Sequence, residues 1–245
     1  MNNKIMKILL TRPKNDSIKT SKTLRKFSLA FEISPLLKIK KHKCDVDYSK
    51  FDIIIFSSKN GVRYSDIDNR KIKENVLIFT VGTETTKLLN KKANYKILNV
   101  EGNIFKLKNQ IRVFLKKGMK ILHPTFRNKN TELENFFLKF KCNYTAFKCY
   151  NSEMVNVCET NFINFIMQND QAIIPIYSSL TANAFIKEMK RNNLEAFCTN
   201  KKFVVISQKV KKELVKGKLD NIFVAEKPDE KHMIKLIKEK YLEDE

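Results

Sequence analysis

The chain has 245 residues, of which 42% are hydrophobic and 30% charged. This is enough apolar material for one large or two small cores, and it excludes a generally disordered protein. Lys and Arg number 48 against 26 Asp and Glu, a net charge of +22 that favours nucleic acid, an anionic membrane or a polyanionic small molecule as partner. The lysines are spread along the whole chain, so a general compositional bias explains the excess equally well.

Cysteine and histidine usage argues against metal and disulfide chemistry. Five cysteines occur without a C-x-x-C pair, as expected for reduced thiols in a cytosol. The histidines, His42, His123 and His232, lie far apart without ligand spacing, so no metal site is expected. No stretch approaches the roughly 20 apolar residues of a membrane span, and the apolar run 8–10 is too short for a signal segment. We therefore expect a soluble cytoplasmic protein without a membrane partner. We also expect a monomer, although no feature of the sequence determines the oligomeric state.

Short apolar runs alternate with longer amphipathic ones along the chain. The runs rich in Ile, Val and Phe predict strands at 7–10, 52–56, 77–81, 96–100, 119–123, 144–150, 172–177, 202–206 and 222–225. Helical spacing of apolar residues predicts helices at 17–29, 61–66, 84–90, 104–116, 131–139, 159–167, 181–190, 210–216 and 230–241. This alternation predicts an α/β fold with mainly parallel sheets.

The chain also resembles itself at an offset of about 120 residues. Three pairs of segments match in the same order: 7–9 with 120–122, 55–58 with 176–179, and 81–88 with 206–214. The offsets are 120 − 7 = 113, 178 − 57 = 121 and 206 − 81 = 125. Two related α/β units follow from this repeat. The extended segments 35–41 and 147–152 are the best candidates for the joints between them.

Small polar residues recur where the predicted strands end and the next helices begin. They stand at 11–13, 57–60, 82–85, 178–181 and 207–209. Strand carboxyl ends are where α/β folds bind ligands, and exposed N–H groups at a helix start attract anions. The alternative is that these residues are only N-caps, worth about 1 kcal/mol each. Because both units carry them, we expect an anionic ligand held between the units.

Several familiar chemistries have no signature in this sequence. It contains no G-x-G-x-x-G after the first strand and no G-x-x-x-x-G-K-[ST], so no nucleotide cofactor is expected. It also lacks G-x-S-x-G, and with three histidines a Ser-His-Asp triad has poor support. What remains is a two-lobed protein with anion-binding loops and no evident nucleophile, metal or cofactor.

Taken in chain order, several motifs resemble those of the uroporphyrinogen-III synthase family. The match spans nearly the whole chain. Its motifs are ILLTRP at 8–13, IFSSKNGV at 55–62, VGTET at 81–85, the extended segment ending at Tyr150, IYSS at 176–179 and VAEKP at 224–228.

The resemblance implies two flavodoxin-like α/β domains with parallel sheets, a two-stranded extended connector and an active site in the cleft between the domains. It also implies that the first strand and helix join the carboxyl-terminal half of the chain. One domain is then discontinuous, about 1–35 with 153–245, and the other spans about 40–148. Residues 36–39 and 149–152 become the connectors.

The activity implied is that of a hydro-lyase in heme biosynthesis. It closes the linear tetrapyrrole hydroxymethylbilane to uroporphyrinogen III, with loss of water and inversion of ring D through a spiro intermediate. The substrate carries acetate and propionate groups, which suits anion-binding loops. The protein's task is mainly to position a reactive chain, which requires no metal or strong nucleophile.

By motif position, Tyr150 aligns with the family's connector tyrosine and is the candidate to assist departure of the hydroxyl group. The alternative for Tyr150 is a half-buried aromatic on an extended strand. Arg12, expected to be exposed, could pair with a substrate carboxylate or be merely solvated. The implied substrate-binding residues are Thr11, Arg12, Ser57, Ser58, Asn60, Gly61, Gly82, Thr83, Thr85, Ser178, Ser179 and Thr181.

The sequence departs from the family pattern at several loops. Ser207, Gln208 and Lys209 replace a loop that usually carries glycine and threonines, so its anion-binding role depends on Lys209. Phe126 and Asn130 stand where the family tends to have Gly and Arg, and Arg127 is a candidate replacement. Ser179 occupies a position where proline is common.

Two other functions stay open at this point. One is a cytosolic two-lobed binder of a small polyanion without turnover. The other is a nucleic-acid-binding protein, which would need aromatic residues interleaved with Lys and Arg on one surface. The strand-end loops named above contain no aromatic residue, and we therefore expect no nucleic-acid partner.

Overall fold

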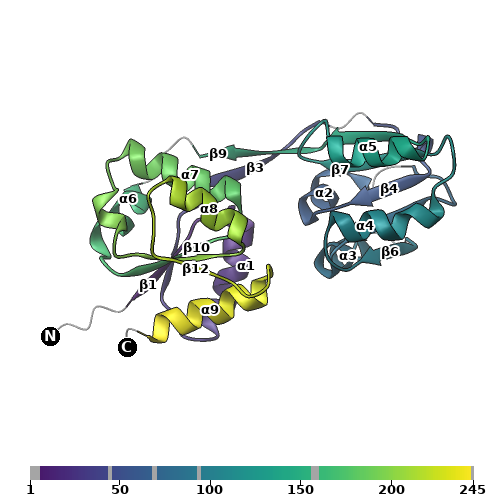
Figure 1. Ribbon diagram of the computed structural model, residues 1–245. Helices are drawn as coiled ribbons and strands as arrows, with labels where there is room; N and C mark the ends of the chain where they lie inside the picture. The colour runs from purple at the N-terminus through teal and green to yellow at the C-terminus, as the bar shows by residue number, and fades with distance from the viewer. Residues whose placement is uncertain (1–5, 44–45, 68–70, 93–94, 156–159, 244–245) are drawn as a thin grey trace. The chain divides into compact units, whose positions relative to one another are not determined.

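The computed structural model describes residues 6–43, 46–67, 71–92, 95–155 and 160–243 (Figure 1). The chain divides into two compact units. Unit 1 consists of Met1–Lys38 with Glu153–Glu245, and unit 2 of Ile39–Ser152. Each unit contains a five-stranded parallel sheet.

The sheet of unit 1 has the order β12-β11-β10-β1-β2, so the first strand of the chain lies inside the sheet rather than at its edge. Helices α6, α7 and α8 cover one face and α1 and α9 the other (Figure 1). The strands are β1 (Lys7–Leu10), β2 (Phe31–Ile33), β10 (Ala172–Ile176), β11 (Lys202–Val205) and β12 (Ile222–Val224). The helices are α1 (Lys14–Arg25), α6 (Thr160–Gln168), α7 (Ser179–Arg191), α8 (Gln208–Lys216) and α9 (Glu230–Leu242), with a 3-10 turn η4 (Ala196–Cys198).

The sheet of unit 2 has the order β6-β5-β4-β7-β8. Helices α2 and α3 pack on one face and α4 and α5 on the other. The strands are β4 (Ile53–Phe56), β5 (Leu77–Val81), β6 (Ile97–Val100), β7 (Lys120–Thr125) and β8 (Asn143–Lys148). The helices are α2 (Lys59–Tyr64), α3 (Thr83–Asn90), α4 (Ile104–Ile111) and α5 (Thr131–Lys139), with 3-10 turns η1 (Tyr48–Lys50) and η3 (Arg112–Phe114).

Successive residues of a strand point alternately into the cores on the two faces of the sheet. In β4, Ile53 and Ile55 point into the core under α4 and α5, whereas Ile54 and Phe56 point into the core under α2 and α3. All four side chains are fully buried. Burying each one contributes about 1.5–3 kcal/mol, which explains why the central strands are apolar at every position.

The two sheets have equivalent topologies, and the internal repeat maps onto them. The three matched pairs of segments fall on β1 and β7, on β4 and β10, and on β5 and β11. In the orders β12-β11-β10-β1-β2 and β6-β5-β4-β7-β8 these strands occupy the same places. The two sheets therefore share one strand arrangement. The polypeptide forms its strands in a different sequence in each unit, since β1 of unit 1 is equivalent to β7 of unit 2.

The chain passes between the units through a separate two-stranded sheet of β3 (Leu37–Lys41) and β9 (Tyr150–Met154). The N–H of His42 donates to the carbonyl of Cys149 at 2.9 Å, and the N–H of Val155 donates to the carbonyl of Leu36 at 3.0 Å. Pairing runs in opposite chain directions, so the strands are antiparallel. The expectation of two α/β units with parallel sheets and a two-stranded connector is confirmed.

Some predicted boundaries are wrong for identifiable reasons. The strand predicted at 144–150 is two strands, because the chain leaves the parallel sheet at Cys149. The helix predicted at 17–29 begins at Lys14, after Pro13, and ends at Arg25, since Ser28 adopts a left-handed backbone with φ of 56°. The helix predicted at 104–116 ends at Ile111 and continues as η3. The edge strand β2 was missed because it has only three residues, all half-buried.

Candidate functional site

The polar loops of unit 2 meet where its strand order reverses. The chain runs from β4 outward to β5 and β6, then returns to β7 on the other side of β4. Ser57 and Ser58 follow β4, and Phe126 follows β7, so both loops lie at the carboxyl edge beside this reversal. Such a topological switch point is the usual ligand site of an open α/β sheet.

Ser58 connects this loop to the connector strand. It is the N-cap of α2, with an extended backbone, and its Oγ accepts a hydrogen bond from the N–H of Gly61 at 3.0 Å. The same Oγ lies 3.3 Å from the hydroxyl of Tyr150, the first residue of β9. The predicted N-cap role of Ser58 is therefore present, together with a contact to the candidate catalytic tyrosine.

Tyr150 is buried, with 6% of its surface exposed, rather than half-buried as the alternative interpretation had it. Burial is the main cause that raises the pKa of its phenol, while the hydrogen bond with Ser58 acts in the opposite direction. The ring lies 5.8 Å from that of Tyr64 and 6.2 Å from that of Phe126, measured between centroids. The hydroxyl thus stays protonated at neutral pH and available as a hydrogen-bond donor.

Ser57 belongs to a second hydrogen-bonded chain. Its Oγ lies 2.6 Å from Nε2 of His123 on β7, and Nδ1 of His123 lies 2.7 Å from the hydroxyl of Tyr144 on β8. The Tyr144 ring stacks on Phe137 of α5 at 5.3 Å. Burial lowers the pKa of His123 to about 4, so the imidazole is neutral. Burial, with a smaller effect of Glu134, raises the pKa of Tyr144.

Gly61 lets the start of α2 approach the end of β7. A Cβ at this position would lie 2.7 Å from the carbonyl oxygen of Pro124, which is closer than real Cβ atoms come. Its neighbour Asn60 accepts a hydrogen bond from Nη1 of Arg63 at 3.1 Å. Gly61 is therefore required here by packing, whatever its part in binding.

The loop after β5 is a further helix start at the same edge. Gly82 is the N-cap of α3 with φ of 85°, a left-handed conformation that favours glycine. Its carbonyl accepts from the N–H of Thr85 at 2.9 Å. Thr83 is exposed and Thr85 is buried. Of these residues, Thr83 is accessible to a ligand, whereas the N–H of Gly82 donates to the carbonyl of Val100 at 2.8 Å.

In unit 1 the equivalent loop follows β10. Ser178 is the N-cap of α7, and its Oγ accepts from the N–H of Thr181 at 3.1 Å and lies 2.8 Å from the Thr181 hydroxyl. Ser179 is the first helical residue and is half-buried. Thr11, after β1, is fully buried, and its hydroxyl has no hydrogen-bond partner among the described residues.

The expectation that Arg12 is exposed is wrong. Its Nη1 donates to Oε2 of Glu230 at 2.7 Å and to Oγ1 of Thr20 at 3.0 Å, and 15% of its side chain is exposed. Its guanidinium lies 3.8 Å from the ring centroid of Tyr177. Arg12 and Tyr177 follow β1 and β10, between which the strand order of unit 1 reverses. The carboxylate that Arg12 meets in the structure is thus an internal one.

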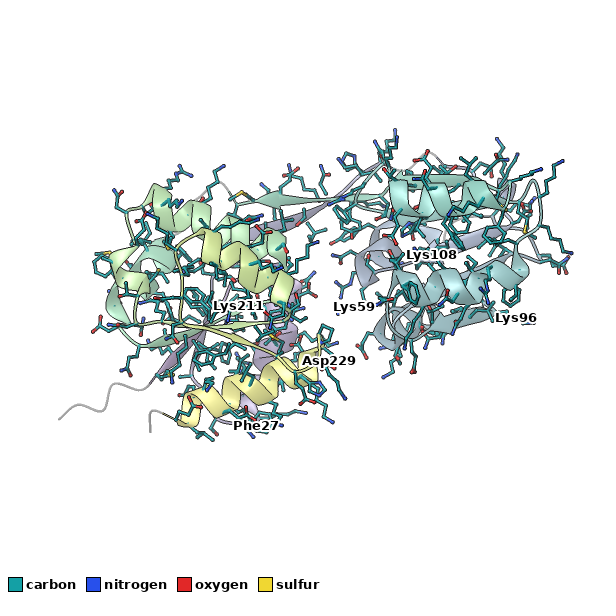
Figure 2. The ribbon with its side chains drawn as sticks, in the orientation of Figure 1. Phe27, Lys59, Lys96, Lys108, Lys211 and Asp229 are labelled. Atoms are coloured by element: carbon teal, nitrogen blue, oxygen red, sulfur yellow. The ribbon has the colours of Figure 1, made fainter. Side chains whose placement is uncertain are left out.

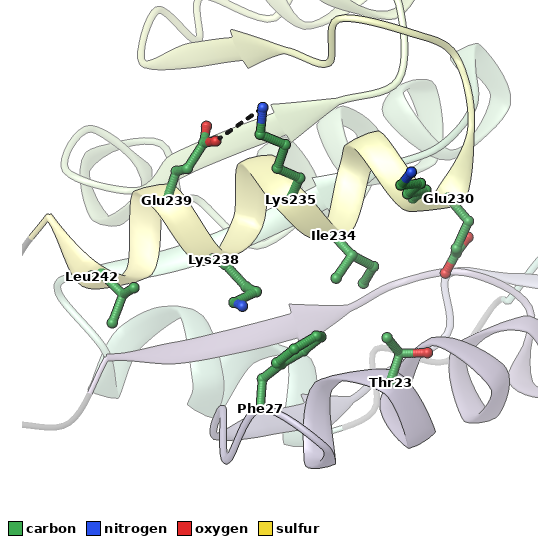
Figure 3. Close-up of a pocket in the computed structure, with 9 residues that line it drawn as sticks. Thr23, Phe27, Glu230, Ile234, Lys235, Lys238, Glu239 and Leu242 are labelled. Carbon is green, nitrogen blue, oxygen red and sulfur yellow. Dashed lines mark ion pairs between the residues drawn. The ribbon is translucent and has the colours of Figure 1, made fainter.

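A groove of about 710 Å³ lies elsewhere in unit 1, between α1 and α9 (Figure 3). Phe27 and Ile234 face each other across it, and Lys235 on its rim pairs with Glu239 at 3.8 Å. Glu230 at its end bonds Arg12, but no residue predicted for the site lines the groove itself. The volume of this groove is therefore no argument for placing the site there.

Lysines occur in both units of the protein. Figure 2 labels Lys59, Lys96, Lys108 and Lys211, which belong to different parts of the two units. Lys108 is paired with Glu132 at 2.8 Å. Within the described residues no group of three or more His, Cys, Asp or Glu could hold a metal ion, and no helix is long and apolar enough to cross a membrane.

Two residues of the unit 2 site, His123 and Tyr144, carried no binding signal in the sequence, and a third, Phe126, was noted only as a departure from the family pattern. His123 ends the strand predicted at 119–123 and lies far from the other histidines in the sequence, but β4 pairs with β7 and thereby brings it to Ser57. Tyr144 is the second residue of β8, and Phe126 is 42% exposed at the carboxyl edge. Arg127 lies over the Phe126 ring at 4.7 Å, and Asn130 caps α5. Strand adjacency was the signal that could have found His123.

Comparison with known proteins identifies the chain's relatives. A family model described as uroporphyrinogen-III synthase HemD matches residues 19–235. The uroporphyrinogen-III synthetase structure from Helicobacter pylori superposes with a TM-score of 0.65 at 15% identity, covering 96% of this chain and 99% of that one. A mutant uroporphyrinogen III synthase from Thermus thermophilus gives 0.60 at 11% identity, covering 98% and 100%. No curated protein matches. Because the family model covers most of the chain, the protein belongs to the uroporphyrinogen-III synthase family of hydro-lyases in tetrapyrrole biosynthesis.

Proposed function

We propose that this chain cyclises hydroxymethylbilane to uroporphyrinogen III, with loss of water and inversion of ring D through a spiro intermediate. Its family membership supports this reaction. The reaction also suits a site of neutral hydroxyl groups, because the substrate itself supplies the reacting carbons. The enzyme then contributes mainly by holding one geometry, a proximity effect.

The observation that carries the proposal is the pair of hydroxyl groups of Tyr150 and Ser58, 3.3 Å apart at the switch point of unit 2. In the proposed mechanism the Tyr150 hydroxyl donates a hydrogen bond to the departing hydroxyl oxygen of the substrate. Its raised pKa supports this role, since the phenol keeps its proton. Loss of water leaves an azafulvene at ring A, which the substituted carbon of ring D attacks.

We propose that the loops at the strand carboxyl ends bind the acetate and propionate groups. Helix starts supply N–H donors and a positive dipole end, and the net charge of +22 favours an anionic substrate. Thr11 and Arg12 would act here by shaping the first loop, and Thr85 and Thr181 by shaping theirs, as all four side chains are largely inaccessible. The proposed binding residues are Thr11, Arg12, Ser57, Ser58, Asn60, Gly61, Gly82, Thr83, Thr85, Ser178, Ser179 and Thr181.

We also propose that the domains of the enzyme are about 1–35 with 153–245 and about 40–148, with 36–39 and 149–152 as connectors. The two compact units support this division. We propose a cytoplasmic monomer, supported by the free thiols of Cys142, Cys149 and Cys198.

The test is an assay with freshly made hydroxymethylbilane, read out as the isomer of the product. The parent protein should give uroporphyrinogen III, and spontaneous type I product alone would contradict the proposal. Tyr150→Phe should lower the rate of type III formation by roughly 10²-fold, within the range for a group that assists proton transfer.

Tyr95→Phe is the matched control for the tyrosine variant. Tyr95 is also in unit 2 and also bonds through its hydroxyl, to the carbonyl of Ile67 at 3.3 Å, but it precedes β6 at the opposite edge of the sheet. Its loss should leave the rate within about twofold of the parent, because Tyr95 lies at the amino edge of the sheet and the candidate site at the carboxyl edge. Equal rates for Tyr150→Phe and the parent would remove the role of Tyr150.

A further inference from the structure

Ser57, His123 and Tyr144 form a continuous hydrogen-bonded chain from the carboxyl edge of the unit 2 sheet into its interior. The two contacts measure 2.6 Å and 2.7 Å. The members come from the loop after β4 and from β7 and β8, so the parallel sheet itself fixes their spacing. His123 is 2% exposed, and Ser57 at the edge is half-buried.

The direction of the chain follows from the Tyr144 hydroxyl. A protonated phenol needs an acceptor, and within the described residues the hydrogen-bond partner of this hydroxyl is Nδ1 of His123. If Tyr144 donates to Nδ1, the neutral imidazole carries its proton on Nε2 and donates it to Ser57 Oγ. Ser57 then has an acceptor site filled, and its own O–H is left to donate elsewhere.

We propose that His123 is a positioning residue which, oriented by Tyr144, holds Ser57 as an outward hydrogen-bond donor to an oxygen of the bound tetrapyrrole. The proposal rests on the proposed function, because it assigns Ser57 a partner in that reaction. The hydrogen-bonded residues Ser57, His123 and Tyr144 only donate and accept hydrogen bonds in this role. Their protonation states are therefore the same before and after a turnover.

Ser57 and Ser58 then have distinct tasks, although they are neighbours. Strand alternation sends successive residues to opposite faces, as Ile55 and Phe56 just before them show. Ser57 meets His123, and Ser58 caps α2 and meets Tyr150. The two neighbouring serines thus make contacts on both sides of the unit 2 sheet: Ser57 with His123, and Ser58 with α2 and Tyr150.

A double-mutant cycle tests whether His123 acts through Ser57. Ser57→Ala should lower kcat roughly tenfold, the scale of one neutral hydrogen bond, with a smaller change in KM. His123→Ala should lower kcat by a similar factor. The double variant should be no slower than Ser57→Ala within about twofold, because the second change removes a partner that has already lost its target.

Two further variants separate positioning from folding. His123→Gln retains a side-chain N–H and should recover most of the lost rate. Tyr144→Phe keeps the ring that stacks on Phe137, loses only the hydroxyl, and should lower kcat roughly threefold. If His123→Ala does not fold, the cycle of Tyr144→Phe with Ser57→Ala replaces it. Melting temperatures are measured for every variant.

If the losses in kcat of the two single variants multiply, so that kcat of the double variant falls roughly hundredfold, the proposal is wrong. So would a change in KM alone, or rates that follow the melting temperature in all variants. A parent protein that yields only type I product would instead contradict the proposed function, so the two failures are distinguishable.

Discussion

Acidification should destabilise this protein through His123. Its imidazole is buried against Ser57 and Tyr144, and burial alone lowers its pKa in the fold, to about 4. In the unfolded chain the pKa returns to about 6.5. As the pH falls, the unfolded state therefore takes up a proton first. The stability that the neutral His123 contributes is therefore fully present above about pH 6.5 and is lost as the pH falls towards 4.

The size of the effect follows from linkage. Between pH 7 and pH 5 the free energy of unfolding should fall by about 2 kcal/mol, and by about 3 kcal/mol in total below pH 4. The carboxyl groups whose pKa the fold lowers, those of Asp47, Asp52 and Asp229, titrate below this window. They therefore do not contribute to the fall between pH 7 and pH 5.

The assay is urea unfolding of the parent and of His123→Gln at pH 7 and pH 5. The parent should lose about 2 kcal/mol between the two pH values and the variant much less, whatever their absolute stabilities. An equal loss in both proteins would refute the argument, since it would show that His123 keeps an ordinary pKa in the fold.

Two further predictions concern stability. Gly61→Ala should lower the free energy of unfolding by about 1–3 kcal/mol in urea melts, because its Cβ would press on the carbonyl of Pro124; unchanged stability would show that α2 is not held there. Thr11→Val removes a buried hydroxyl without a described partner and should leave stability unchanged or raise it by about 1 kcal/mol. The control Ser17→Ala breaks a 2.9 Å bond to the carbonyl of Arg12 and should lower it by about 1 kcal/mol, so equal losses in the two variants would contradict this interpretation.

The general architecture could be predicted from local patterns. Runs such as 53–56, apolar at every position, indicate strands covered on both faces, and each was followed by a helical run. Serines before helices, such as Ser58 and Ser178, are N-caps in the structure because an oxygen at that position meets orphan N–H groups. The internal repeat predicted two related units, and the matched strands occupy equivalent places in the two sheets.

The contacts of the candidate site could not be predicted in this way. Ser57 and His123 are 66 positions apart, and Arg12 and Glu230 are 218 apart. The first pair forms because the sheet order places β4 beside β7, and the second because α9 packs on the same face of the unit 1 sheet as α1, next to the loop after β1. Arg12, which resembled an exposed anion receptor, is occupied by an internal carboxylate. His123, which appeared isolated, connects the serine after one strand to a tyrosine on another.

Hydrophobic periodicity and capping residues are local features of the sequence. They were enough to predict the alternating strands and helices and where most of them begin. They report that a residue is buried, but not against what, because the hydrophobic effect has no direction. Hydrogen bonds do have direction and reach only about 3 Å. The partners of Ser57, Arg12 and Tyr150 were therefore decided by strand order, by the packing of α9 on the α1 face of the unit 1 sheet, and by the break at Cys149.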